Sequence, residues 1–375
     1  MDLQECRTEL DQIDEQIVKL FEERMGICSS VAEYKIAAGK PVYDGERERQ
    51  KLSAVSSMAH GDYNQTAVQE LFTQIMTISR RYQYRLMAQH GKLEDLGYQQ
   101  VEQLPVNGVR VVYQGVEGAY SHGAALQFFG KETELFHVQT FEEAMQQVQE
   151  GKADYGVLPI ENSSAGAVID NYDLQIKYHN HIVAETFVKV RHGLLGLEEA
   201  ELSDIKTVYS HPQALMQCSQ FLHDQKQIRQ VSLENTAVAA KKIVEDKDRT
   251  QAAIASEIAA ELYGLKVLRA AIQNSESNTT RFIILSSRPI YCRDASKVSI
   301  AFELPHRSGT LYNILGHFIF NGVNMRMIES RPIPGRSWEY RFFVDIEGNL
   351  ADAAIRNALN GVAAEAQNMR ILGNY

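Results

Sequence analysis

Cationic side chains in the first 90 residues have the types and spacing that binding of a small anion requires. Arg24 and Lys35 are 11 residues apart, which at 100° per residue brings them to within roughly 20° of each other on one helix face. The run at 44–49, Asp-Gly-Glu-Arg-Glu-Arg, adds charges of both signs, and Gln83 adds a neutral donor. These residues can line one pocket, and a solvated helix face with ion pairs would show the same pattern.

A second group of polar side chains follows short apolar segments in the middle of the chain. Each motif alone is also typical of helix caps and turns, because serine, asparagine and glycine are the residues that caps and turns use. Since the motifs follow successive predicted strands, we expect them to converge on one cleft. The side chains concerned are Ser121, His122, Glu161, Asn162, Ser163, Ser210, Gln213, Thr280 and Arg281.

A third group lies near the end of the sequence. Gly309 and Thr310 open a predicted helix, and Glu329 and Ser330 end a predicted strand. Free backbone donors at a helix start can hold the carboxylate of an amino acid, and nearby side chains can hold its ammonium group. An ordinary helix start would explain Gly309 equally well.

The composition excludes several classes of protein. Of 375 residues, 48 are acidic and 38 are Lys or Arg, so the net charge of −10 gives no support for nucleic-acid binding. The acidic first residues do not form a signal peptide, and the longest uncharged stretch, 308–325, includes several polar residues and does not have the pattern of a membrane span. The four cysteines form no CxxC pair. We therefore expect a cytoplasmic protein without membrane or nucleic-acid partners.

The first 90 residues are predicted to be all-α. Apolar residues recur at helical spacing from 3 to about 38, and Gly39 ends the pattern. Asp44 can cap a second, shorter helix, and a third follows. A helix of about 34 residues is roughly 50 Å long, which is more than a monomeric bundle of this size needs, so its apolar face is expected to meet a second chain.

The rest of the chain is predicted to be of mixed class. Residues 91–107 show no periodicity and are predicted to be a linker. Strands alternate with helices over 108–287, which indicates an α/β domain with a largely parallel sheet and two lobes, 108–188 with 269–287, and 189–268. Residues 297–375 show the order β-α-β-β-α-β of a ferredoxin-like α+β module.

The helical part resembles the chorismate mutase domain of the bifunctional chorismate mutase/prephenate dehydratase family of phenylalanine biosynthesis. The resemblance extends over the whole chain except the linkers. It implies an intertwined homodimer that holds chorismate in a folded conformer and rearranges it to prephenate, with no cofactor and no metal. Lys35 and Gln83 would donate to the ether oxygen, and Glu48 would orient the hydroxyl. The chorismate-binding residues implied are Arg7 of the partner subunit, Arg24, Lys35, Asp44, Arg47, Glu48 and Gln83.

The α/β part resembles prephenate dehydratase, a fold like that of periplasmic binding proteins, through motifs such as Asn-Thr-Thr-Arg-Phe at 278–282. Prephenate must lose its ring hydroxyl and a carboxylate to become phenylpyruvate. The resemblance implies that Thr280 is the catalytic hydroxyl and that Arg281 binds a carboxylate, while Glu161 and His122 are candidates for the ultimate proton donor. The prephenate-binding residues implied are Ser121, Glu161, Asn162, Ser163, Ser210, Gln213, Thr280, Arg281 and Phe282.

The last module resembles the ACT regulatory domain, which implies feedback inhibition by L-phenylalanine. The sequence has Gly-Thr-Leu where the family has Gly-Ala-Leu, so Thr310 adds a β-branched hydroxyl beside the effector pocket. The effector-binding residues implied are Gly309, Thr310, Leu311, Asn324, Glu329 and Ser330.

Two other functions fit parts of this pattern. A mutase fused to prephenate dehydrogenase would need the dinucleotide-binding motif GxGxxG, which the sequence lacks. A non-catalytic solute and amino-acid sensor would not need to keep Lys35, Gln83 and Thr280. The long helix and the ACT sheet each suggest a two-fold contact, which gives a homodimer, or a homotetramer if different pairs use them.

Overall fold

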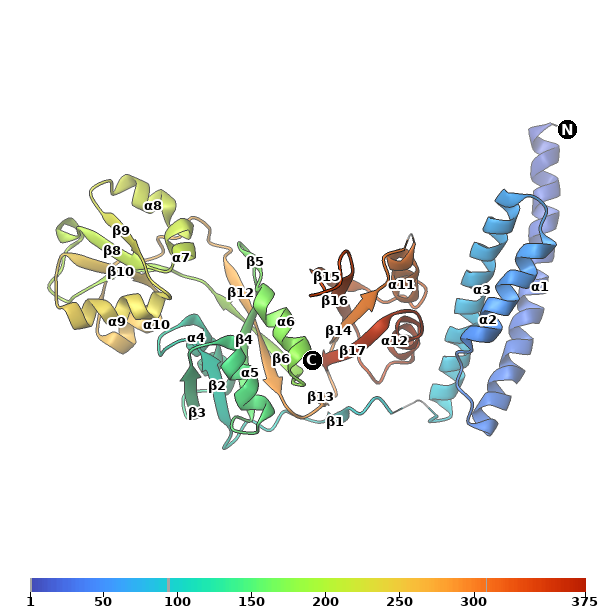
Figure 1. The fold of residues 1–375 in the computed structure, drawn as a ribbon, viewed down its shortest axis with the longest axis horizontal. Coiled ribbons are helices and arrows are strands. Elements are labelled where there is room, and N and C mark those ends of the chain that lie inside the picture. Colours follow the sequence, from blue (N-terminus) through green and yellow to red (C-terminus); the bar gives the residue numbers. More distant parts are fainter. Residues whose placement is uncertain (1, 93–94, 308) are drawn as a thin grey trace. The chain divides into compact units, whose positions relative to one another are not determined.

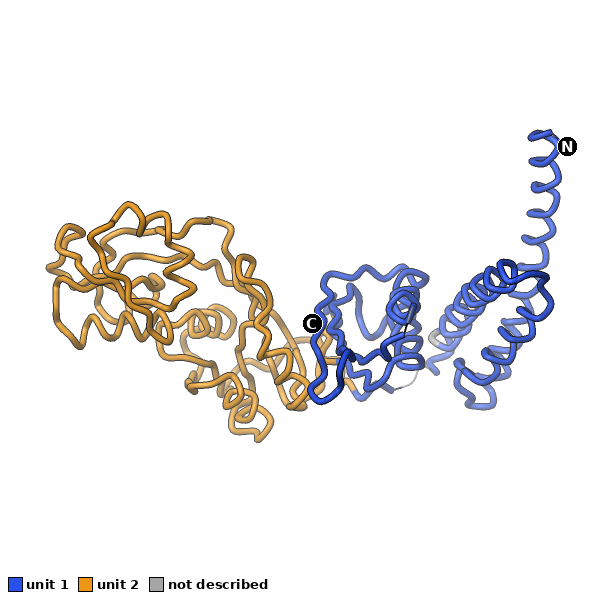
Figure 2. The backbone as a smooth tube through the Cα atoms, turned by 45° about the horizontal axis from the view of Figure 1, so that its top comes forward, with its two compact units in different colours: residues 1–97, 294–371 blue, residues 98–293, 372–375 orange. Residues whose placement is uncertain are grey.

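The computed structural model describes residues 2–92, 95–307 and 309–375, which form the helices and strands labelled in Figure 1. The chain divides into two compact units (Figure 2). Unit 1 comprises residues 1–97 and 294–371, and unit 2 comprises 98–293 and 372–375. No helix within the described ranges is long and apolar enough to cross a membrane.

Three helices form the N-terminal part of unit 1, as predicted. The first begins at Asp2, whose side chain accepts from the Glu5 N–H, and ends at Gly39, whose φ of +62° favours glycine. Asp44 caps the second helix by accepting from the Arg47 N–H. The helices are α1 (Leu3–Ala38), α2 (Gly45–Met58) and α3 (Asp62–Gln89).

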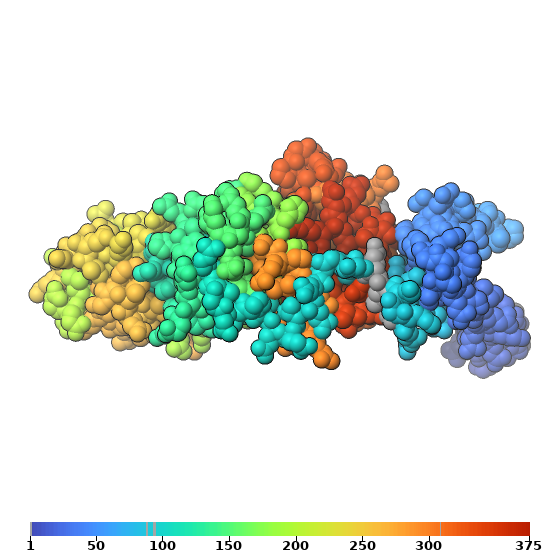
Figure 3. Space-filling view, turned by 90° about the horizontal axis from the view of Figure 1, so that it is seen from below, coloured from blue at the N-terminus to red at the C-terminus, as the bar shows by residue number. Residues whose placement is uncertain are grey.

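The apolar face of α1 is largely uncovered in the single chain. Leu10 is 58% exposed, Ile17 55% and Ile27 67%. Figure 3 shows the dark blue N-terminal half of this helix with no other segment over it on the face in view. Burial of such side chains is worth roughly 1.5–3 kcal/mol each, so this face is a strong candidate for contact with another chain.

The C-terminal part of unit 1 has the predicted order of strands and helices. Its strands β15, β16, β14 and β17 lie side by side in that order, with β16 antiparallel to both of its neighbours β15 and β14. The last residues of β17 belong to unit 2. The elements are β14 (Lys297–Leu304), α11 (Thr310–Ile319), β15 (Met325–Pro332), β16 (Tyr340–Glu347), α12 (Ala353–Glu365) and β17 (Gln367–Asn374).

The first lobe of unit 2 is built on a mixed sheet of order β6-β12-β4-β2-β3. Strands β3, β2 and β4 are parallel, whereas β12 returns from late in the chain and pairs antiparallel with both β4 and β6. Residues 99–101, inside the predicted linker, form a strand, β1, that pairs with β13. The elements are β1 (Gln99–Val101), β2 (Arg110–Gln114), α4 (Tyr120–Phe129), β3 (Glu134–Val138), α5 (Phe141–Gln149), β4 (Tyr155–Asn162), β5 (Gly166–Ala167), α6 (Ile169–Lys177), β6 (His181–Lys189), β12 (Thr279–Ser286) and β13 (Ile290–Cys292).

The second lobe has a sheet of order β11-β7-β10-β8-β9. Strands β10, β8 and β9 are parallel, and β7 is antiparallel to β10 and β11. Both sheets are therefore mixed, which corrects the prediction of a largely parallel sheet. The elements are β7 (Gly193–Gly196), η1 (Leu202–Asp204), β8 (Thr207–Ser210), α7 (Pro212–Gln217), α8 (Ser219–Asp224), β9 (Arg229–Ser232), α9 (Thr236–Asp246), β10 (Gln251–Ala255), α10 (Glu257–Tyr263) and β11 (Lys266–Arg269).

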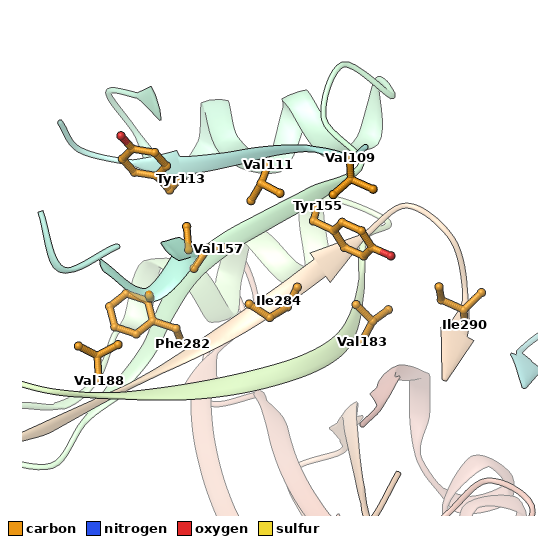
Figure 4. Packing of buried hydrophobic residues seen from close by; sticks show 12 residues of the cluster. Val109, Val111, Tyr113, Tyr155, Val157, Val183, Val188, Phe282, Ile284 and Ile290 are labelled. Atoms are coloured by element: carbon orange, nitrogen blue, oxygen red, sulfur yellow. The ribbon is translucent and has the colours of Figure 1, made fainter. Parts of the chain in front are cut away.

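The core of the first lobe fixes the strand that carries the predicted catalytic threonine. Phe282 and Ile284 of β12 are buried against Val157, Val183 and neighbouring apolar side chains (Figure 4). Since side chains alternate along a strand, Thr280 lies on the same side of β12 as Phe282 and Ile284. Its position is therefore set by a rigid, well-packed element.

Candidate active sites

Side chains from the three N-terminal helices converge in unit 1. The Arg24 guanidinium of α1 donates to the Ser79 hydroxyl of α3 at 2.5 Å. The Lys35 ammonium donates to the Val42 carbonyl oxygen at 2.5 Å, in the connection to α2. Gln83 follows Ser79 by four residues, so it lies one turn further along the same face of α3.

Two of these side chains are buried or partly buried polar groups that suit the binding of a ligand. Burial lowers the pKa of Lys35, against the opposing effect of Asp44 and Glu48, and so makes its proton easier to share. Gln83 is only 7% exposed, and its Oε1, an acceptor, has no hydrogen-bond partner among the described residues. A buried polar group without a partner is costly, which favours a role in binding a ligand.

Arg80 is a member of this site that the sequence analysis missed. It is 6% exposed and forms an ion pair with Glu48 of α2. It also donates to the Thr77 hydroxyl at 3.2 Å, and its guanidinium carbon lies 5.3 Å from the centre of the Tyr43 ring. The sequence signal that could have identified Arg80 was its position three residues before Gln83, on the same face of one helix. Arg80 holds the Glu48 carboxylate in one orientation.

The remaining predicted chorismate-binding residues are exposed. Arg7 precedes Arg24 by 17 residues on the uninterrupted helix α1, a distance of about 25 Å. It therefore cannot join the Arg24 site of its own chain. Asp44 is used as the cap of α2, where it accepts from the Arg47 N–H at 3.0 Å, and the Arg47 side chain is exposed.

A cavity of about 550 Å³ lies in unit 2 and is lined by residues of both lobes. Volumes of this size fit a small organic molecule. The predicted residues that line it are Ser121, Asn162, Gln213, Thr280 and Phe282.

The hydroxyl of Thr280 is oriented by Asn162. The Asn162 amide nitrogen donates to Thr280 Oγ1 at 2.9 Å and to Asn278 Oδ1 at 2.8 Å. Its carbonyl oxygen accepts from the N–H groups of Ser164 and Ala165, both at 3.0 Å. Because Thr280 Oγ1 accepts here, its own proton is available to a molecule in the cavity.

Helix N-termini supply the positive potential of this cavity. Its described lining residues include no Lys or Arg, but they include Tyr120, Val168 and Thr236, at the starts of α4, α6 and α9. Neither α4 nor α6 is capped by a side chain, so their first N–H groups can bind an anion. Backbone N–H groups are therefore the donors that this cavity offers to a carboxylate.

Two histidines that line the cavity were not among the predicted site residues. His192 is 2% exposed, and its ring nitrogens lie 3.1 Å from the Tyr120 hydroxyl and 3.0 Å from Gln217 Oε1. His211 Nδ1 accepts from the Gln213 N–H at 3.2 Å, so its proton is on Nε2. The signal that could have identified His192 was a histidine in the short connection between two apolar strands, three residues after β6 and directly before β7.

The structure corrects the role expected for Arg281. Its side chain leaves β12 on the face opposite Thr280, because the two residues are consecutive in a strand. There its Nε donates to Glu185 at 2.7 Å, and its Nη1 lies 3.8 Å from Glu161. Arg281 and Glu161 therefore do not line the cavity as prephenate-binding residues would.

Three further expected residues also serve other contacts. Ser210 is fully buried and donates to the Ile254 carbonyl oxygen at 2.6 Å, and Ser163 donates to the Ser277 carbonyl oxygen at 3.2 Å. His122 Nδ1 accepts from the Gly118 N–H at 3.1 Å. None of the three lines the cavity in the described part of the chain.

We expect unit 2 to lose stability on mild acidification. Burial lowers the pKa values of His192 and His211 below their ordinary 6.5. Just below pH 6.5 the unfolded chain therefore binds more protons than the folded chain, so this stability is present above that pH and falls as pH decreases through it. The midpoint of thermal unfolding should be lower at about pH 5.5 than at about pH 7.5. An equal pH dependence in His192→Gln would contradict the assignment to His192.

The residues expected to bind an effector lie in the C-terminal part of unit 1. Gly309 precedes α11 with a φ of +82°, and the first residue of that helix, Thr310, donates its hydroxyl to the carbonyl oxygens of Pro305 and Arg307 at 3.2 and 3.0 Å. Its hydroxyl is thus used within its own loop. Ser308, before them, lies outside the described residues. Leu311 lies in α11, Glu329 and Ser330 lie on the edge strand β15, and Asn324 immediately precedes β15.

Comparisons with known proteins cover both sites. Family models match for chorismate mutase type II over residues 6–84 and for prephenate dehydratase over residues 111–290. The bifunctional chorismate mutase/prephenate dehydratase of Escherichia coli K12 is 32% identical over 375 residues, which is 98% of this chain and 95% of that protein.

Solved structures resemble part of the chain. The prephenate dehydratase of Arthrobacter aurescens in complex with L-Phe is 30% identical with a TM-score of 0.67, and covers 71% of this chain and 90% of its own. GqqA, described as a novel type of quorum quenching acylase, is 32% identical with a TM-score of 0.66, and covers 71% of this chain and 97% of its own. Within the described residues, no three or more His, Cys, Asp or Glu side chains form a group that could hold a metal ion.

Proposed function

The chain belongs to the family of bifunctional chorismate mutase/prephenate dehydratases, and we propose that its two reactions take place at the two sites described above. It rearranges chorismate to prephenate, and it then converts prephenate to phenylpyruvate. The helical site of unit 1 is assigned to the first reaction and the cavity of unit 2 to the second.

In the mutase reaction, the enzyme holds a folded dicarboxylate and stabilises the charge that develops on the breaking ether oxygen. Lys35 and Gln83 donate to that oxygen, which the desolvation of Lys35 and the buried Gln83 amide support. Arg24 binds a carboxylate, which suits its forked guanidinium. Glu48 orients the substrate hydroxyl. Arg47 and Arg7 of the partner subunit complete the set of cations.

In the dehydratase reaction, the bond from the ring to the carboxylate breaks, its electron pair completes the aromatic ring, and the ring hydroxyl leaves with a proton as water. Thr280 donates its hydroxyl proton in a hydrogen bond to the leaving oxygen, because Asn162 already donates to Oγ1. The uncapped starts of α4 and α6 bind carboxylate. A loosely held carboxylate in a dry pocket leaves more readily as CO₂.

The observation that carries the second assignment is the Asn162–Thr280 hydrogen bond at the wall of the cavity. An ultraviolet assay of the full-length protein with chorismate, without added cofactor, tests both reactions. We expect loss of chorismate and formation of phenylpyruvate. Accumulation of prephenate alone would refute the dehydratase assignment. A protein that is inert to chorismate but melts at a higher temperature with phenylalanine would support a sensor instead.

The dimer, the effector and the location are further parts of the proposal. The exposed apolar face of α1 supports a homodimer that shares Arg7 across subunits, and sedimentation would detect this dimer.

The C-terminal module is assigned as an ACT domain, in which bound L-phenylalanine inhibits the enzyme. The residues assigned to bind L-phenylalanine are Gly309, Thr310, Leu311, Asn324, Glu329 and Ser330. The bound L-Phe of the Arthrobacter relative supports this assignment. A homotetramer follows if the ACT sheet makes a separate contact, and we assign the enzyme to the cytoplasm.

Arg80→Met is expected to reduce the mutase reaction about tenfold, because loss of the guanidinium frees the Glu48 carboxylate to leave its orientation. It is also expected to destabilise the helical part, since it removes one partner of a mostly buried ion pair. Steady-state rates with chorismate and with prephenate, together with thermal unfolding, measure both effects.

Arg81→Met is the matched control for this variant. Arg81 is the next residue of α3 and is exposed, so its loss removes the same charge without disturbing Glu48. Equal losses of mutase activity in the two variants would show that total charge matters, and not the contact of Arg80 with Glu48.

A further inference from the structure

We propose that Tyr375 is a positioning residue for the dehydratase reaction, acting through Arg281 on the hydroxyl of Thr280. The proposal rests on the assignment of Thr280 to that reaction. The Arg281 Nη2 donates to the Tyr375 hydroxyl oxygen at 2.7 Å, and its Nε donates to Glu185 at 2.7 Å. Residues 372–375 belong to unit 2, although the strand that brings them there, β17, begins in unit 1.

The geometry of β12 connects this contact to the cavity. Thr280 and Arg281 are consecutive, so one side chain faces the cavity and the other faces away from it. The pairing of β12 with β4 shifts register directly after Arg281. The extra residue, Ile160, lies in β4, whereas β12 keeps a regular register with β6 from Thr279 to Ile284. The backbone therefore fixes β12 on its β6 edge, and on the irregular β4 edge the side-chain contacts of Arg281 add to that hold. Holding Arg281 from outside therefore adds to the packing of β12 and to the Asn162 hydrogen bond in fixing the Thr280 hydroxyl inside.

Tyr375 is itself held in place by the residues before it. Gly373 pairs with Ile182 of β6, and a Cβ at Gly373 would lie 2.0 Å from the Ile182 carbonyl oxygen. Only glycine allows the two backbones to approach so closely. Leu372 and Asn374 are 2% and 0% exposed. Residues 372–375 are therefore packed against β6.

The contact with Tyr375 fixes the orientation of the Arg281 guanidinium and does not neutralise its charge. Glu185 supplies a carboxylate to Arg281 at 2.7 Å, and the Arg281 side chain is only 10% exposed. A neutral phenol adds no counter-charge, but it fixes the direction of a second guanidinium nitrogen. With two nitrogens fixed, the planar guanidinium cannot rotate about its bond to the chain.

Tyr375→Phe in the full-length enzyme tests the proposal, because it removes only the hydroxyl. We expect kcat for prephenate to fall about tenfold with KM changed by less than about twofold, since misplacement of a reacting group affects the chemical step more than binding. The chorismate reaction should be unchanged and serves as an internal control for folding of unit 1. A wild-type kcat for prephenate in Tyr375→Phe would overturn the proposal. Failure of the unmodified enzyme to convert prephenate would instead refute the function.

Two further sets of variants separate positioning from general stability. Tyr375→Phe should cause almost no further loss in an Arg281→Lys background, because the lysine lacks the fork on which Tyr375 acts; additive losses would overturn the proposal. Gly373→Ala should displace the segment from β6 and lower kcat for prephenate about as much as Tyr375→Phe does. Full activity of Gly373→Ala would also contradict the proposal. Tyr63→Phe is the matched control, because Tyr63 is 85% exposed.

Discussion

Lys35→Ala is expected to lower the chorismate reaction by about 10²–10³-fold while conversion of supplied prephenate continues at the wild-type rate. Lys35 is the partly buried ammonium of the helical site, and burial lowers its pKa. Its loss removes the ammonium group that we propose as a donor to the ether oxygen, where charge develops. Rates with each substrate, measured on one preparation, distinguish the two reactions.

The control for this variant is Lys40→Ala. Lys40 is an exposed lysine just beyond the end of α1, where its ammonium lies 5.5 Å from the centre of the Tyr34 ring. It should keep both activities. Loss of prephenate conversion in Lys35→Ala would argue against separate sites, and a fully active mutase would remove Lys35 from the mechanism.

Thr280→Val is expected to lower prephenate conversion by roughly 10²–10⁴-fold and to leave the mutase unchanged. Valine keeps the shape of threonine but lacks the hydroxyl that accepts from Asn162 and donates into the cavity. Thr280→Ser, which keeps the hydroxyl on a less restricted side chain, should lose less activity than Thr280→Val. The rate of phenylpyruvate formation from prephenate compares the wild-type enzyme with Thr280→Val and Thr280→Ser.

Thr279→Val is the neighbouring control, because the Thr279 hydroxyl donates to the Ser277 carbonyl oxygen at 3.3 Å and does not line the cavity. We expect it to keep most of the activity. A fully active Thr280→Val would exclude the hydroxyl from the mechanism, and inactivity of both variants would point to damage of β12.

Net charge is a poor guide to the local charge of the two proposed sites. The chain carries −10, and the cavity of unit 2 has no Lys or Arg among its described lining residues. We propose that the uncapped starts of α4 and α6 supply the attraction instead. On this proposal the two sites recognise carboxylates differently, with guanidinium and ammonium groups in unit 1 and with backbone amides in unit 2.

The sequence by itself determined what depends on periodicity and residue type. The three N-terminal helices, the two-lobed α/β region and the element order of 297–375 follow from hydrophobic spacing and from Gly39 and Asp44 at helix ends. The long apolar face of the first helix is likewise a property of spacing. The motifs that contain Lys35, Gln83 and Thr280 carry the family resemblance on which the proposed chemistry rests.

Only the tertiary structure decided which side of an element a residue serves and what it meets there. Arg281 is next to Thr280 in the sequence but on the opposite face of β12, where it meets Glu185 and Tyr375. Strand alternation separates such neighbours, while folding brings together residues that are 94 positions apart. The same reason explains why Arg80 and His192 were not predicted as site residues, since their partners Glu48 and Tyr120 lie on other elements. The sequence thus supplies the candidates for the reacting groups, and long-range packing determines how their side chains are held.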